Sequence, residues 1–134
     1  MKVFIDTNIF LDLILKREKY LEALSIFKAV EEKKLNATIL DITILNIDYI
    51  ARKQSKDLRN FLTIINQLFT VVGASNSSIK EALEIKNKDL EDNLQYVSAR
   101  YSKSEIIITN DKKFYTGDIE IITSQDFVDK YLNF

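Results

Sequence analysis

Short apolar runs alternate with longer segments of helical periodicity along this chain. Within residues 20–34, apolar side chains recur every three or four positions, which is typical of a helix with one buried face. The segment Glu-Ile-Ile-Ile-Thr at 105–109 instead predicts a buried strand. The full pattern predicts strands at 2–5, 35–40, 69–72, 105–109 and 119–122, and helices at 9–17, 20–34, 43–53, 58–69, 75–86, 89–101 and 125–131.

This alternation of strands and helices predicts an α/β fold, with a mainly parallel central sheet and helices on both faces. The chain contains no proline, and its two glycines, Gly73 and Gly117, lie far apart at expected turns. No repeat or linker is present, so we expect one domain over residues 1–134. In sheets of this kind, ligands bind beyond the carboxyl ends of the strands.

The composition narrows the possible chemistry. There is no cysteine and no histidine, which excludes thiolate zinc sites, cysteine nucleophiles and the Ser-His-Asp mechanism. The 19 basic and 20 acidic residues leave a net charge of −1, so the total does not indicate a strongly basic nucleic-acid binder. The chain shows no signal-peptide pattern and no apolar run near the roughly 20 residues that span a bilayer. We therefore expect a cytoplasmic protein without a membrane partner.

Three acidic residues occupy positions that favour a common site. Asp6 directly follows the first strand, and Asp111 follows the strand at 105–109. Asp92 lies in the first turn of the helix that precedes that strand. If the two strands are neighbours, all three acids approach one edge of the sheet. Grouped carboxylates repel one another unless a cation compensates them, and Mg²⁺ or Mn²⁺ prefers oxygen ligands. We predict that Asp6, Asp92 and Asp111 bind such a cation.

Each acid also has an ordinary structural interpretation. Asp6 could cap the next helix, Asp92 could be favoured by the dipole of its own helix, and Asp111 could belong to a turn. The other acids, among them Asp89 and Glu91, are assigned by default to turns, caps and solvated faces, and these two are the best alternatives for the site.

Basic residues give a second signal. Arg52, Lys53, Lys56 and Arg59 fall within eight residues, a cluster that is more often a solvated surface than a phosphate-binding one. Lys112 and Lys113 stand beside Asp111 and are better placed to contact a phosphate backbone. We expect Lys112, Lys113, Arg52 and Lys53 to be the candidate RNA contacts.

Three segments resemble the PIN-domain nucleases, in particular the VapC-like toxins of prokaryotic toxin–antitoxin pairs. These are MKVFIDTNIFLDLILKRE, LEDNLQYVSAR and IIITNDKKF, and they occur in the family's order. The resemblance implies a three-layer α/β/α sandwich and a metal-dependent ribonuclease site, with Asp6, Asp92 and Asp111 as catalytic and metal-binding carboxylates. It further implies that Asn8 and Thr109 hold carboxylates by hydrogen bonds, that the protein forms a homodimer and that an antitoxin inhibits it.

One position departs from the family. The family usually has a glutamate on the helix after the second strand, where this chain has Asn46. An amide oxygen can bind a hard cation, but it brings no charge and cannot act as a base. The site would then hold three carboxylates rather than four.

Three hypotheses about function follow. The first is an endoribonuclease that uses Mg²⁺ or Mn²⁺ to hydrolyse RNA phosphodiester bonds. The second is a PIN-like module that binds RNA or a protein without cleavage, with Asn46 as the mark of lost activity. The third is a receiver-like domain with a phosphorylated aspartate. The third is disfavoured because only Asp6 stands at the end of the first strand.

Overall fold

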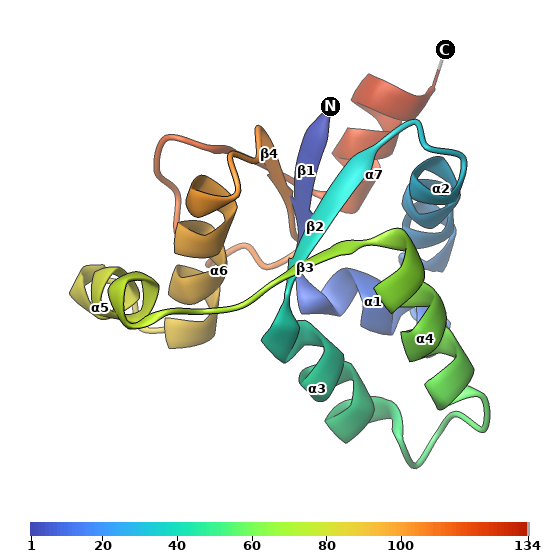
Figure 1. Ribbon diagram of the computed structural model, residues 1–134. Helices are drawn as coiled ribbons and strands as arrows, with labels where there is room; N and C mark the ends of the chain where they lie inside the picture. The colour runs from blue at the N-terminus through green and yellow to red at the C-terminus, as the bar shows by residue number, and fades with distance from the viewer. Residues whose placement is uncertain (134) are drawn as a thin grey trace.

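The computed structural model, described over residues 1–133, contains one sheet of five parallel strands in the order β3-β2-β1-β4-β5 (Figure 1). The strands are β1 (Lys2–Ile5), β2 (Asn36–Leu40), β3 (Thr70–Val72), β4 (Ile106–Ile108) and β5 (Glu120–Ile122). The helices are α1 (Thr7–Ile14), α2 (Tyr20–Glu31), α3 (Asp41–Ala51), α4 (Leu58–Leu68), α5 (Asn76–Glu84), α6 (Leu90–Tyr101) and α7 (Ser124–Phe127), which continues into the π-helix η1 (Val128–Leu132).

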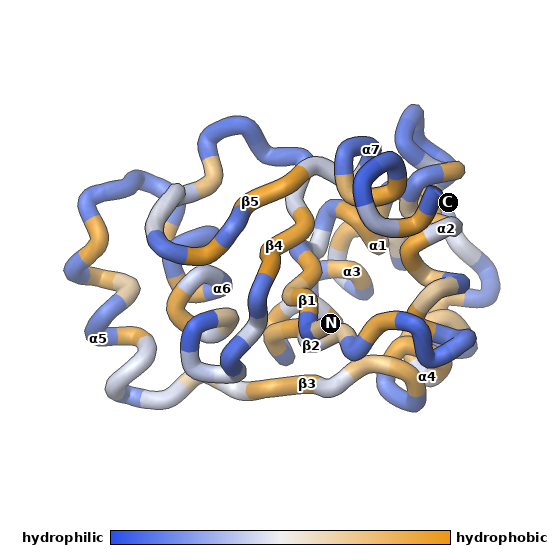
Figure 2. The backbone as a smooth tube through the Cα atoms, turned by 90° about the horizontal axis from the view of Figure 1, so that it is seen from above, coloured by the Kyte–Doolittle hydropathy of each residue, from blue (hydrophilic) through white to orange (hydrophobic). Residues whose placement is uncertain are grey.

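Helices cover both faces of this sheet, as the alternating pattern predicts. Successive side chains of a strand point to opposite faces. Val3 and Ile5 of β1 therefore pack in the core shared with α1, α2, α4 and α7. Phe4 packs on the other face, with Tyr96 and Ala99 of α6. Figure 1 shows α5 and α6 on one side of the strands and α1, α2, α4 and α7 on the other. In Figure 2 the strands form an apolar centre between helices whose outer surfaces are hydrophilic. The expected three-layer α/β/α arrangement is confirmed.

The ends of several helices differ from the sequence prediction. The first helix spans Thr7–Ile14 rather than 9–17, and the second ends at Glu31 rather than at residue 34. The chain turns at Lys16 and Lys33, whose φ angles of 51° and 62° are left-handed and end the helical path. The last predicted helix, 125–131, is divided between α7 and η1. Apolar periodicity predicts the face of a helix better than its ends.

Strand pairing sets the position of the site. Ile5 of β1 lies opposite Ile108 of β4, and the Asp6 backbone N–H donates to the Ile108 carbonyl at 3.1 Å. The chain leaves β1 toward β2, whereas β4 lies on the other side of β1. This is the switch point at which sheets of this type bind ligands.

Beyond the end of β2, α3 begins at once. The hydroxyls of Thr7 and Thr43 form a buried 2.8 Å hydrogen bond that holds α3 against α1.

Within residues 1–133, no helix has the length and apolar character needed to cross a membrane.

Candidate active site

Asp6 is buried at the end of β1, and both of its carboxylate oxygens accept hydrogen bonds. Thr109 Oγ1 donates to Oδ2 at 2.8 Å, and Gln95 Nε2 donates to Oδ1 at 2.9 Å. Asp6 stands at the N-cap position of α1, but its side chain makes no capping hydrogen bond. The helix-capping alternative for this side chain is therefore wrong. Burial raises the pKa of Asp6, and the hydrogen bonds from Gln95 and Thr109 partly oppose that effect.

Three other acids form the tightest group. Ligand oxygens of Asp89, Asp92 and Asp111 all lie within 4.8 Å of one another. Asp89 is the N-cap of α6, where its Oδ1 accepts from the Asp92 backbone N–H at 3.2 Å. The cap also brings the Asp89 carboxylate to the group. Asp6 lies outside this group, but its charge raises the pKa of Asp92. Asp89, which the sequence offered only as an alternative, thus joins Asp92 and Asp111 in this group.

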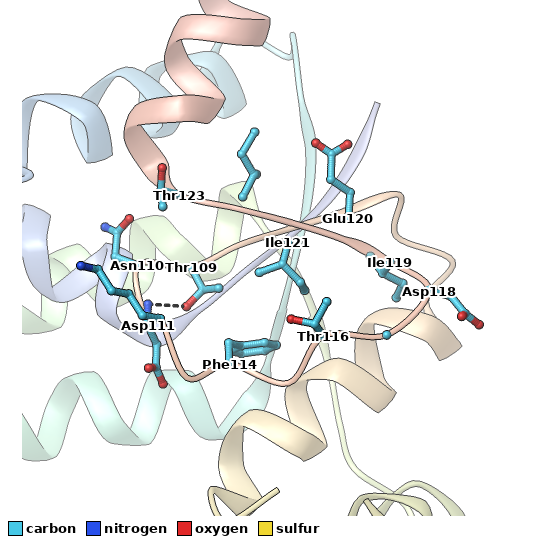
Figure 3. Close-up of a pocket in the computed structure, with 13 residues that line it drawn as sticks. Thr109, Asn110, Asp111, Phe114, Thr116, Asp118, Ile119, Glu120, Ile121 and Thr123 are labelled. Atoms are coloured by element: carbon cyan, nitrogen blue, oxygen red, sulfur yellow. Dashed lines mark hydrogen bonds between the residues drawn. The ribbon is translucent and has the colours of Figure 1, made fainter.

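Asp111 lies in a tight turn after β4. Its Oδ1 accepts from the Lys113 backbone N–H at 2.9 Å, so the turn interpretation describes part of its role. Its own backbone N–H donates to Thr109 Oγ1 at 3.1 Å, the contact drawn as a dashed line in Figure 3. Thr109 therefore connects Asp111 to Asp6 and sets the position of one carboxylate relative to the other.

The carboxyl groups of Asp92 and Asp111 differ strongly in proton affinity. Burial, followed by a hydrogen bond to Asp111 and the charges of Asp6 and Asp89, raises the pKa of Asp92 to about 9. The same hydrogen bond, with a backbone N–H from Lys113, lowers the pKa of Asp111. Without a cation, Asp92 keeps a proton at neutral pH and shares it with Asp111. A proton held in this way occupies a place that suits a metal ion.

The donor set fits a hard divalent cation. Asp92 Oδ2 is buried and has no hydrogen-bond partner among residues 1–133. The acids of the site are Asp6, Asp89, Glu91, Asp92 and Asp111. None of them takes part in the five ion pairs found among residues 1–133. Carboxylate oxygens without a basic partner are the ligands that Mg²⁺ and Mn²⁺ prefer, and a cation there would offset their repulsion.

Asn46 lies beside this site and contacts a carboxylate directly. Its Nδ2 donates to Glu91 Oε1 at 2.8 Å. Glu91 Oε2 also accepts from Gln95 Nε2 at 3.3 Å, and the same Gln95 group donates to Asp6. Burial and the nearby charge of Asp6 raise the pKa of Glu91. Asn46 therefore belongs to a chain of hydrogen bonds that reaches Asp6.

The remaining predicted residues are spread over the surface. Asn8 is exposed, and within the described residues its side chain makes no hydrogen bond to a carboxylate. Arg52 pairs with Asp48 at 3.0 Å and lies over the Tyr49 ring, while Lys53 is exposed after the end of α3. Lys112 and Lys113 are exposed beside Asp111.

An open groove of about 880 Å³ runs over the acids. It is lined by Asp89 and Asp111 together with three lysines, Lys86, Lys88 and Lys113. Of these lysines, the sequence predicted only Lys113. Lys86 and Lys88 belong to the α5–α6 loop, and their position beside Asp92 in the sequence was the available signal. The groove thus combines basic side chains with acidic ones, an arrangement suited to a phosphodiester chain.

A second cavity, of about 470 Å³, lies between the loop after β4 and β5 (Figure 3). Figure 3 shows the Asp111 carboxylate pointing to the opposite side of its loop from Thr123. This loop passes close to Tyr96, whose hydroxyl accepts from the Asp118 and Ile119 backbone N–H groups. A Cβ at Gly117 would overlap that hydroxyl, so this close approach requires glycine. We assign the cavity a structural role.

Gln95 is the site residue that sequence reasoning missed. It is fully buried on α6, four residues after Glu91 and three after Asp92. The signal was a polar residue among the apolar positions of a predicted helix, close to Tyr96, Val97 and Ala99. Such a residue needs a polar partner, and here the partners are two carboxylates.

The chain is similar to known proteins in both sequence and structure. A family model described as PIN domain matches residues 2–113. Ribonuclease VapC1 of Aquifex aeolicus (strain VF5) is 32% identical over 141 residues, which cover 97% of this chain and 95% of that protein.

Three solved structures share the fold. A toxin–antitoxin complex from Klebsiella pneumoniae contains a chain with a TM-score of 0.69 and 22% identity, covering 91% of this chain and 97% of that one. A chain of VapBC2 from Rickettsia felis, bound to a DNA fragment from its promoter, has a TM-score of 0.66 and 19% identity. The match covers 92% of this chain and 98% of that one. VapC20 of Mycobacterium tuberculosis, a toxin that cleaves the sarcin-ricin loop, has a TM-score of 0.65 and 11% identity. The match covers 84% of this chain and 92% of that one.

Proposed function

The chain belongs to the PIN-domain family, and from this membership and the acidic site we infer that it is an endoribonuclease. We propose further that it is a VapC-like toxin whose activity requires Mg²⁺ or Mn²⁺. The observation that carries the cation is the group of Asp89, Asp92 and Asp111, with a buried Asp92 oxygen that has no partner among the described residues. We also propose that the protein acts in the cytoplasm, where RNA is available to it.

Each part of the site has a distinct task in this proposal. Asp89, Asp92 and Asp111 hold the cation, and Asp6, fixed by Thr109 and Gln95, adds its negative charge beside them. When bound, the cation supplies a water of lowered pKa and stabilises the charge that develops on the phosphate. Asp92 gives up its proton when the cation binds, because the two compete for the same oxygens.

In this proposal, the RNA backbone binds in the groove beside these acids. Lys86, Lys88 and Lys113 line the groove and bind phosphates on either side of the one that is cleaved. No aromatic side chain lines this groove among the described residues, so base stacking contributes little. We therefore expect contacts with the backbone to dominate affinity. Lys112, Arg52 and Lys53 remain predicted contacts that do not line this groove.

The test is a cleavage assay on a single-stranded RNA with a fluorophore and a quencher at its ends. We expect cleavage with Mn²⁺ or Mg²⁺, none with EDTA, and recovery when metal is added back in excess. Asp111→Asn is the matched inactive variant, because it keeps the shape of the side chain and removes its charge. Cleavage that persists equally in EDTA and in Asp111→Asn would contradict the proposed site.

A second candidate function is a module that binds a protein partner without cleaving RNA. Exposed apolar side chains favour a protein partner whether or not the chain is also a ribonuclease. Leu45 and Tyr49 of α3 are 68% and 76% exposed, and Ile64 of α4 is 41% exposed. Apolar side chains exposed together are typical of binding surfaces. Since two of the similar structures are toxin–antitoxin complexes, we propose that an antitoxin covers this surface.

Co-expression with the product of the neighbouring gene tests this partner. We expect a stable complex that no longer cleaves RNA, and Tyr49→Glu should weaken it. Light scattering of the isolated chain tests the predicted homodimer separately. A complex whose affinity is unchanged by Tyr49→Glu would exclude the α3 surface.

A further inference from the structure

Glu91 holds an unusual position beside the acidic site. It lies on the first turn of α6, next to Asp92 in sequence, and it is half-buried without an ion-pair partner among residues 1–133. A glutamate side chain in that position can turn to solvent and become hydrated. Instead it is held by two neutral amides, Asn46 of α3 and Gln95 of α6.

The Gln95 amide connects Glu91 to Asp6. Its Nε2 group has two hydrogens, and the two acceptors are Asp6 Oδ1 at 2.9 Å and Glu91 Oε2 at 3.3 Å. Two carboxylates are thus held on either side of one amide nitrogen. That arrangement brings their charges together with only neutral donors between them, so it stabilises the fold less than pairing with a basic side chain would.

A separate observation shows that this network is incomplete by itself. Gln95 is completely buried, yet its Oε1 has no hydrogen-bond partner among the described residues. A buried amide oxygen without a donor costs free energy. Together with the unpartnered Asp92 Oδ2, it gives two buried acceptors that a cation, or a water molecule bound to one, would satisfy.

We propose that Glu91 is a positioning residue of the cation site: it fixes Asp6 through the Gln95 amide and adds its own negative charge to those of Asp6, Asp89, Asp92 and Asp111. Asn46 holds it in place by the 2.8 Å hydrogen bond. The charge that Asn46 does not bring from α3 is thus supplied from α6. This inference rests on the proposed cation-dependent function.

The first variant is Glu91→Gln, which removes the charge and keeps the shape. The new amide oxygen can still accept from Gln95, and rotation of the Asn46 amide lets its oxygen accept from the new NH₂ group. The fold should therefore persist. Mn²⁺ binding to the metal-free full chain is then measured by calorimetry, and we expect an affinity about 10- to 100-fold lower than that of the parent protein.

The second variant places the carboxylate on α3 instead of α6. In the double variant Glu91→Gln/Asn46→Glu, the donor and acceptor of this pair exchange places, and the site regains its carboxylate. We expect the double variant to recover most of the lost Mn²⁺ affinity. The control is Glu31→Gln, which removes an exposed carboxylate of α2 on the opposite face of the sheet and should leave the affinity unchanged.

The outcomes separate this inference from the proposed function. A parent protein that binds no Mn²⁺ overturns the cation site itself. A parent that binds Mn²⁺, with Glu91→Gln binding equally tightly, overturns only the role of Glu91. Weaker binding by the single variant without recovery in the double variant overturns the role of its charge. Should Glu91→Gln lose its folded circular dichroism spectrum, the double variant decides alone: near-parental affinity supports the proposal, and weak affinity contradicts it.

Discussion

Two acidic regions lie at the carboxyl edge of the sheet, and the chain treats them differently. On the α1 side, Asp12 accepts a 3.4 Å hydrogen bond from Asn110 and faces Arg17 at 3.9 Å. On the α6 side, the acids of the site have amide and hydroxyl donors but no ion pair among the described residues. Burial raises the pKa of Asp12 as it does that of Asp6, but only for Asp12 does a basic side chain oppose the rise.

The difference shows how a structural acid can be told from a functional one. The chain itself compensates Asp12, which then helps to hold the turn after β4 against α1. It leaves the α6 group without an ion pair among the described residues, and such a group is tolerated where a bound cation offsets the repulsion. Substitutions in the two regions, changes of pH and changes of salt test this contrast, and the largest effect is expected at the cation ligands.

The first prediction compares one acid from each region. Asp111→Asn should lower RNA cleavage by at least about 100-fold, because the cation loses a charged ligand. Its melting temperature without metal should fall slightly, because hydrogen bonds from Asp92 and from the Lys113 backbone N–H favour the charged form of Asp111 in the folded protein. Asp12→Asn should change cleavage little and stability by less than about 1 kcal/mol, because its ion pair is partly exposed. Equal losses of cleavage in both variants would erase the contrast.

The second prediction concerns pH and stability without metal. The folded-state pKa values of Asp6, Glu91 and Asp92 are raised, so the folded protein binds more protons than the unfolded chain above the ordinary acid range. The free energy of unfolding should therefore fall as pH rises from about 4 toward the Asp92 value of about 9. For each extra bound proton, the fall is at most about 1.4 kcal/mol per pH unit.

Urea denaturation at a series of pH values measures this slope. Asp92→Asn should flatten it more than Asp12→Asn does. Saturating Mn²⁺ should reverse it, because the cation binds the deprotonated carboxylates. A metal-free protein that becomes steadily more stable up to pH 9 would contradict the assigned protonation of Asp92.

The third prediction compares two basic regions. Replacing Lys86, Lys88 and Lys113 together by glutamine should raise KM for RNA several-fold, since these lysines line the groove over the acids. For each lysine that no longer binds a phosphate, the dependence of log K on log salt should also become shallower by about 0.7. Arg52→Gln with Lys53→Gln should have a smaller effect, because Arg52 is already paired with Asp48. Binding titrations at several salt concentrations, with Asp111→Asn as background, separate the two regions.

The fourth prediction tests the compensated side. Ser124 is fully buried and exchanges hydrogen bonds with Asn110 through its backbone N–H and its hydroxyl. Ser124→Ala should cost about 1 kcal/mol in the free energy of unfolding. It should leave Mn²⁺ affinity unchanged, as measured by calorimetry. A weaker Mn²⁺ affinity would mean that the two regions are coupled.

The order of the elements and the faces of the helices could be predicted from the sequence, because both depend on local periodicity. Asp6 and Asp111 could be placed at the carboxyl edge for the same reason, since each directly follows an apolar strand. Asp92 could be predicted from its place in the first turn of a helix. The family pattern added Thr109, whose hydroxyl contacts Asp6 in the structure.

Tertiary structure decided which of these acids share a pocket. The approach of α6 to β1 puts the Gln95 amide between Asp6 and Glu91, and the tight turn after β4 brings Asp111 to Asp89 and Asp92. These contacts join residues up to 89 positions apart, and a displacement of α6 relative to the sheet by a few ångströms would break them. Periodicity assigns a residue to a face of its own helix, but the angle between helix and sheet comes from packing across the whole core. For that reason Asp6, Asp92 and Asp111 could be predicted from the chain, whereas Gln95 and the contact between Asn46 and Glu91 could only be seen in the folded protein.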